Sequence, residues 1–167
     1  MGVWMHRQIK VKGVEQMKKL DVLRKCVMFR ALDDKQLREV EKMCDPEEFE
    51  AGTVICKQDC KEENLYVVEH GAVGIILEVG PLAQRQVQAV TDYEVFGWSA
   101  MLDPYICTAT VKALEKTKVL AFDGQELSSL CVTKPEIGCR VSRGIARVVA
   151  MRLRQAYAQL LGVTSQV

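Results

Sequence analysis

The feature that most constrains the fold is a change of hydrophobic periodicity near residue 50. Before it, apolar residues recur at helical spacing, and after it they gather in short β-branched segments separated by turn residues. These segments lie at residues 53–56, 65–68, 73–77, 85–90, 107–114 and 118–122. Short strands at close spacing with tight turns between them indicate an antiparallel roll or barrel. The pattern therefore predicts a mainly β domain.

Helices are predicted on both sides of the strands. On the N-terminal side, two short helices are expected, the second capped by Asp33 or Asp34 and ended by Asp45-Pro46. On the C-terminal side, a short helix precedes a long one that Pro135 begins. We expect a basic N-terminal arm over residues 1–13, the roll with its short helices over 14–134, and the long helix over 135–167.

The charge balance excludes a general attraction to polyanions. With 23 basic and 22 acidic residues, the net charge is +1, so the whole chain has no electrostatic pull toward nucleic acid or a membrane. No apolar run is long enough to cross a bilayer, and the N-terminus lacks the apolar region of a secretory signal. We expect a cytoplasmic protein with no membrane partner.

Catalytic and metal-binding motifs are not evident. Ser99 has no G-x-S-x-G setting, and the two histidines lie far apart in sequence, so no enzymatic activity is expected. The seven cysteines are odd in number and form no C-x-x-C pair, which favours buried thiols and predicts no metal. Their abundance alone leaves open a redox or metal sensor as a third hypothesis.

Four local signatures resemble the cyclic nucleotide-binding domain of the catabolite-activator and redox-regulator superfamily, over roughly residues 20–161. They are Phe29-Arg30-Ala31-Leu32, the segment 65–73 (LYVVEHGAV), Phe96-Gly97, and the segment 108–113 (TATVKA). The resemblance implies an antiparallel double-stranded β-helix, a jelly-roll-like β-roll, with N-terminal helices and a long C-terminal helix. It also implies a small anionic ligand, such as cyclic AMP or cyclic GMP.

In the family, the segment from Phe-Gly to Ala-Thr-Val is a phosphate-binding cassette, in which backbone amides surround the cyclic phosphate. Two positions depart from its pattern here: Trp98 stands at the family's glutamate and Cys107 at its arginine. Loss of the arginine predicts an affinity for cyclic AMP lower by about tenfold to a hundredfold. We predict that Arg143 or Arg147 of the long helix replaces this charge. The candidate ligand-binding residues are Phe96, Gly97, Trp98, Ser99, Ala100, Cys107, Thr108, Ala109, Arg143 and Arg147.

The long helix carries two apolar stripes. Val141, Ile145 and Val148 form one, which can pack on the roll. The other follows the alternating three- and four-residue spacing of a coiled-coil seam, and together with the family resemblance it predicts a homodimer. The predicted interface residues are Ser142, Ala146, Val149, Leu153, Ala156 and Leu160. The alternative is one helix packed on its own domain through a single stripe.

Together these features predict a non-enzymatic sensor module that binds a cyclic nucleotide or another small anionic ligand in a degenerate cassette. The chain ends at Val167, before the winged helix-turn-helix of DNA-binding relatives, so we expect a protein partner and no DNA-binding domain. The alternative is a ligand-free pseudo-sensor that acts as a dimeric interaction module. Trp98 and Cys107 favour that alternative.

Overall fold

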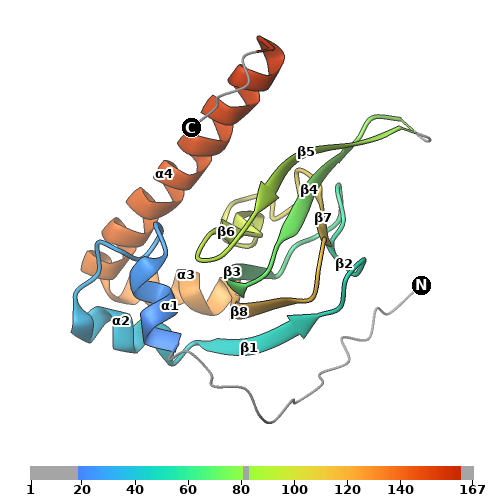
Figure 1. Ribbon diagram of the computed structural model, residues 1–167. Helices are drawn as coiled ribbons and strands as arrows, with labels where there is room; N and C mark the ends of the chain where they lie inside the picture. The colour runs from blue at the N-terminus through green and yellow to red at the C-terminus, as the bar shows by residue number, and fades with distance from the viewer. Residues whose placement is uncertain (1–18, 81–82, 163–167) are drawn as a thin grey trace.

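The computed structural model of the protein describes residues 19–80 and 83–162, so the predicted basic arm at residues 1–13 lies outside the described residues. Within them, eight strands form two antiparallel sheets (Figure 1). The first has the order β1 (Cys44–Phe49), β8 (Thr117–Asp123), β3 (Asn64–His70) and β6 (Val95–Phe96). The second has the order β2 (Val54–Cys56), β7 (Thr110–Ala113), β4 (Val73–Glu78) and β5 (Gln84–Val90). The predicted β-roll is confirmed.

The two central strands of the first sheet, β3 and β8, are buried on both faces, and the alternation of their side chains shows how. On β3, Leu65 and Val67 join a hydrophobic core shared with the helices, whereas Tyr66 and Val68 join a second core between the two sheets. β8 divides in the same way, because successive side chains of a strand point to opposite faces. The fully apolar segments of the sequence are therefore the strands that separate the two cores.

Four α-helices flank the roll: α1 (Lys19–Lys25), α2 (Asp34–Glu41), α3 (Gly124–Thr133) and α4 (Pro135–Leu160). The Asp33 side chain caps α2 and forms a capping box with Gln36. Of the two residues predicted to cap this helix, Asp33 is therefore the one that does so. Figure 1 shows α1, α2 and α3 grouped around the first half of α4, whose second half continues past β5. There Gln155 accepts a hydrogen bond from Gln88 of β5, so the second half also contacts the roll.

One sequence prediction is wrong. Asp45-Pro46 was expected to end a helix, but residues Cys44–Phe49 form β1. This strand lies at the edge of its sheet and pairs only with β8, where Pro46 is opposite Leu120. An edge strand tolerates proline because hydrogen-bonding groups on one of its sides need no partner strand. The short strand β6 was also missed, and the strand expected from Cys107 begins only at Thr110.

Candidate functional site

The candidate site begins where β6 ends, at Gly97. This residue has a φ of 75°, and a Cβ atom there would lie 2.5 Å from the carbonyl oxygen of Asn64 on β3. A side chain is thus excluded both by the left-handed backbone and by the close approach of β3. The turn leads directly into the 3-10 helix η1 (Trp98–Met101).

The next contact fixes η1 against α3. Ala100 is buried, and a Cβ atom on Gly124, the first residue of α3, would lie 2.4 Å from the Ala100 carbonyl oxygen. The glycine therefore permits a close approach that a larger residue would prevent. As a result, the predicted cassette is held between β3 on one side and α3 on the other.

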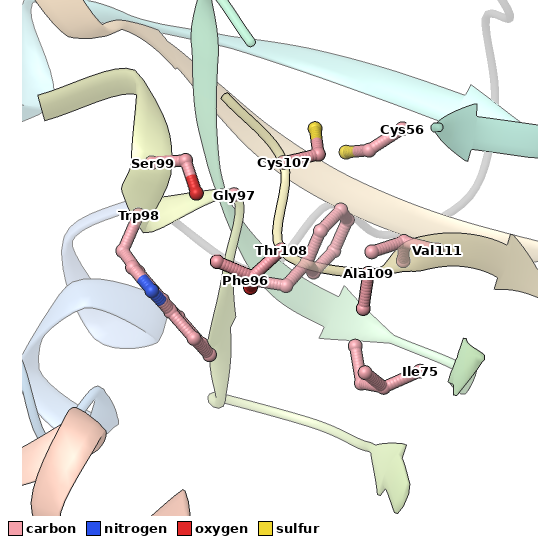
Figure 2. A pocket seen from close by; sticks show the side chains of 10 residues that line it. All are labelled: Cys56, Ile75, Phe96, Gly97, Trp98, Ser99, Cys107, Thr108, Ala109 and Val111. Atoms are coloured by element: carbon pink, nitrogen blue, oxygen red, sulfur yellow. The ribbon is translucent and has the colours of Figure 1, made fainter. Parts of the chain in front are cut away.

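A small pocket lies beside η1, and Figure 2 shows the side chains around it. Seven of the eight cassette residues named from the sequence line it: Phe96, Gly97, Trp98, Ser99, Cys107, Thr108 and Ala109. Ala100, the eighth, packs toward α3 instead. The strands add Cys56, Ile75 and Val111, which sequence reasoning missed although each belongs to a predicted strand.

The pocket is narrow and carries no cation among its lining residues. Its empty volume is about 330 Å³ with the open solvent at its mouth included, but the volume open to the centres of water-sized molecules is only about 30 Å³. Small-molecule pockets usually span about 300–1,000 Å³, so this space suits a few water molecules. Phe96 stacks on Tyr66 with ring centroids 4.8 Å apart, and these rings fill the core beside the pocket.

Neither arginine predicted to reach the cassette lines the pocket. The side chains of Arg143 and Arg147 are exposed, because the buried stripe of α4 runs along the other side of the helix. That stripe includes Val141, Ile145 and Val148, as predicted, and continues to Arg152. The signal for Arg152 was present in the sequence, since it lies four residues beyond Val148.

Arg152 is only 9% exposed, and it is incompletely paired. Its Nη2 atom lies 3.8 Å from Oε1 of Glu94, two residues before Phe96, and its Nε has no hydrogen-bond partner among the described residues. Burial lowers the pKa of the Arg152 guanidinium, and the charge of Glu94 opposes that shift. A buried cation thus lies between α4 and the segment that leads into the cassette.

The opposite side of the pocket is a cluster of two thiols and a carboxylate. The sulfur atoms of Cys56 and Cys107 and a carboxylate oxygen of Glu62 all lie within 4.8 Å of one another, and all three residues are buried. Figure 2 shows the two sulfur atoms next to each other. The Cys107 thiol donates to Oε2 of Glu62 at 3.3 Å. Where the family has its arginine, this chain therefore has a thiol hydrogen-bonded to a buried carboxylate.

The cluster strongly perturbs its own thiol chemistry. The pKa of the Cys56 thiol lies well above its usual range because of a hydrogen bond with Cys107, burial, and the charge of Glu62.

The prediction that the cysteines are buried holds for Cys26, Cys44, Cys56 and Cys107, whereas Cys131 is half-buried and Cys60 and Cys139 are exposed. None of the seven forms a disulfide.

An eight-stranded roll with a glycine-hinged cassette, a pocket against it and a long C-terminal helix defines a ligand-binding module of the cyclic nucleotide type. The chain belongs to the cyclic nucleotide-binding domain family, whose model matches residues 46–134. The resemblance inferred from the sequence is thereby confirmed. Among the described residues, no helix has the length and apolar character required to cross a membrane.

Relatives place the same domain in larger proteins. The chain is 26% identical over 136 residues to a protein assigned as a potassium channel in Rhodopseudomonas palustris, covering 81% of this chain and 32% of that protein. It is 22% identical over 135 residues to the CRP-like cAMP-activated global transcriptional regulator of Mycobacterium tuberculosis, covering 81% and 58%. The chain thus spans a third to somewhat over half of these curated relatives.

A solved structure shows the same fold. The N-terminal domain of a transcriptional regulator from Streptomyces coelicolor A3(2) is 28% identical and superposes with a TM-score of 0.67, over 88% of this chain and 100% of that domain. The similarity extends beyond the residues matched by the family model, so it also covers elements outside the roll.

Proposed function

We propose that the protein is a non-enzymatic regulatory module whose cassette binds a cyclic nucleotide or another small anionic ligand. The observation that supports this most is the convergence of seven cassette residues, drawn from the segments 96–99 and 107–109, on one pocket beside Gly97. Convergence of this kind, on a family fold, is the usual arrangement of a ligand site.

The pocket also suggests how the site differs from one that binds cyclic AMP tightly. It has no lining cation, and Trp98 is half-buried at its edge, where it packs against the helix-side core. A nucleotide would need the indole to move, because the volume open to the centres of water-sized molecules is only about 30 Å³. The proposed ligand therefore either is smaller than a nucleotide or binds with a rearrangement of η1.

The missing positive charge is best replaced by Arg152. Unlike Arg143 and Arg147, it faces the roll, and it has an unpaired Nε atom and a distant carboxylate partner. A buried guanidinium without full pairing gains more from an incoming anion than an exposed one does. Arg152 does not line the pocket, so it would reach an anion there only with a shift of α4 toward the cassette.

Regulation would follow from the contacts of η1. Ala100 touches the first turn of α3, and α3 is joined to α4 by the single residue Lys134. A ligand that moves η1 would thus shift both C-terminal helices. Such coupling requires the ligand to bind two conformations of the protein with different affinity. The output would be read by a partner protein or by another domain.

The test is thermal unfolding with cyclic AMP, cyclic GMP and a panel of anionic metabolites, followed by calorimetry on any that raise the melting temperature. A ligand that binds the folded state alone at a hundred times its Kd stabilises it by about 2.7 kcal/mol. If no compound in the panel stabilises the protein, the binding proposal is wrong, and the ligand-free alternative replaces it.

We also propose that α4 pairs two copies of the chain. All six predicted interface residues are exposed, on a face of α4 about a quarter turn round the helix from its buried stripe. Large apolar side chains dominate the second half of the helix, where Leu153 is 49% and Leu160 82% exposed. Solvent-exposed apolar stripes of this length are typical of helix pairing.

Sedimentation equilibrium measures this pairing. We expect a dimer for the wild type and a monomer for Leu153→Glu, because a charge in the seam of a paired helix is desolvated. Leu114→Glu, an equally exposed leucine on the roll, is the control and should remain dimeric. A monomeric wild type at all concentrations would contradict the proposal.

A further inference from the structure

The cluster of Cys56, Glu62 and Cys107 is not explained by ligand binding in the cassette. We propose that it binds a thiophilic divalent metal ion of the zinc class, with both thiolates and the carboxylate as ligands. The proposal does not depend on the identity, or on the existence, of a ligand in the pocket.

The three residues come from separate segments that the fold brings together. Cys56 ends β2, Glu62 lies in the connection to β3, and Cys107 lies 51 positions after Cys56, shortly before β7. Their donor atoms lie within 4.8 Å of one another, and the residues are 4%, 7% and 5% exposed. Two sulfur atoms and one carboxylate oxygen that converge in a buried part of the pocket lining form a compact set of metal ligands.

The carboxylate is already oriented for such a role. Oε1 of Glu62 accepts the backbone N–H groups of Glu63 at 3.1 Å and Asn64 at 3.0 Å. Oε2 is thereby turned toward the Cys107 sulfur. Metal-binding carboxylates are commonly held by outer hydrogen bonds of this kind, which fix the ligand before the metal arrives.

Charge balance favours a divalent ion. Replacing two thiol protons by one M²⁺ ion leaves the net charge of the cluster unchanged, so loading adds no buried charge. Two sulfur donors select zinc over magnesium or calcium, which prefer oxygen. Four-coordinate zinc would have one position left, and both cysteines line the pocket, so a small molecule in the pocket could occupy it.

The experiment titrates the reduced, metal-free full chain with Co²⁺ and then displaces it with Zn²⁺. We expect one equivalent of Co²⁺ with the intense near-ultraviolet absorption of thiolate-to-cobalt charge transfer, and release of two protons per ion. Cys107→Ser and Cys56→Ser should each lose at least half of this absorption. Cys60→Ser is the matched control, since Cys60 is exposed and only four residues from Cys56, and it should match the wild type.

Three results would overturn the proposal: no charge-transfer absorption in the wild type with excess Co²⁺, equal absorption in Cys107→Ser, or loss of absorption in Cys60→Ser. If the serine variants do not fold, the Co²⁺ affinity of Glu62→Gln tests the proposal instead. It keeps both thiols and an oxygen that accepts the two backbone N–H groups, and it should weaken Co²⁺ binding at least about tenfold. An unchanged affinity in Glu62→Gln would equally contradict carboxylate ligation.

Discussion

The two sides of the pocket have been shaped by different constraints. The cassette wall (Phe96–Ser99) depends on backbone geometry, because Gly97 must fit against β3. The thiol wall (Cys56 and Cys107, with Glu62 behind them) depends on side chains, and there the family's arginine is a cysteine. The comparison teaches that close backbone packing determines the cassette wall, whereas side-chain identity determines what the thiol wall can bind.

The largest expected effect is on the cassette wall. Gly97→Ala should destabilise the protein by about 3 kcal/mol, because it adds the cost of a left-handed non-glycine residue to a clash with the Asn64 carbonyl oxygen. Urea unfolding measures this. Gly80→Ala is the control: its φ is 79° but nothing lies within 4 Å of the new Cβ, so it should cost only about 1–2 kcal/mol. Equal losses in the two variants would show that the cassette wall is not tightly packed.

The second prediction restores the charges that the pocket lacks. The double variant Trp98→Glu, Cys107→Arg should bind cyclic AMP about tenfold to a hundredfold more tightly than the wild type, by roughly 1.5–3 kcal/mol from the charge-assisted bond to phosphate. Calorimetry gives the affinities. Trp98→Glu alone is the control and should gain less. If the double variant binds cyclic AMP no more tightly than the wild type, these two side chains alone do not account for the difference between this pocket and a cyclic AMP site.

The third prediction concerns alkaline pH at the thiol wall. Above the usual thiol pKa of roughly 8.5, the unfolded chain releases the Cys56 proton while the folded protein keeps it. The unfolded state then binds fewer protons, so stability falls as pH rises, by at most about 1.4 kcal/mol per pH unit for this thiol. No loss from this group is expected below about pH 8.

Urea unfolding between pH 8 and pH 10 measures the effect as a difference between the wild type and Cys56→Ala. The buried thiols of Cys26 and Cys44 have their pKa raised by desolvation to about 12 and about 11, but both proteins share these contributions. Cys139→Ala, which removes an exposed thiol, should follow the wild type. Parallel profiles for the wild type and Cys56→Ala would mean that the thiol wall is accessible to water.

The smallest expected change in stability is at Arg152. Arg152→Met replaces a buried, poorly paired cation by an apolar side chain of similar length, so stability should change by less than about 1 kcal/mol or increase. Binding of an anionic ligand should nevertheless be lost, whereas Arg143→Ala and Arg147→Ala should retain it. If calorimetry shows binding by Arg152→Met but not by Arg143→Ala or Arg147→Ala, the positive charge that binds the anion lies on the exposed side of α4.

Much of the fold could be predicted from the sequence because local patterns determine it. The strands β3 and β8, the cap at Asp33 and the stripe from Val141 to Val148 all depend on neighbouring residues in the chain. β1 could not be recognised, because its proline and acidic residues suit an edge strand only once β8 lies beside it. Its composition alone favours a turn.

The site was predictable only in part, for a similar reason. The cassette segment follows from motifs, and seven of its residues do line the pocket. The thiol cluster could not be predicted, because Cys56 and Cys107 are distant in sequence. Cys60 is close to Cys56 in sequence, but Cys60 is exposed whereas Cys56 is buried. Helical spacing, by contrast, could have identified Arg152, because it continues the stripe of Val141, Ile145 and Val148.

The measurement that tests the central claim most directly is a calorimetric titration of the wild type, Thr108→Asp and Thr108→Asn with the compound that most raises the melting temperature. Thr108 lines the pocket but is exposed, so both variants should fold. The account predicts one site per chain in the wild type, its loss in Thr108→Asp through charge repulsion, and its retention in Thr108→Asn. Equal binding by all three proteins would show that the ligand binds elsewhere and would contradict a cassette that recognises anions.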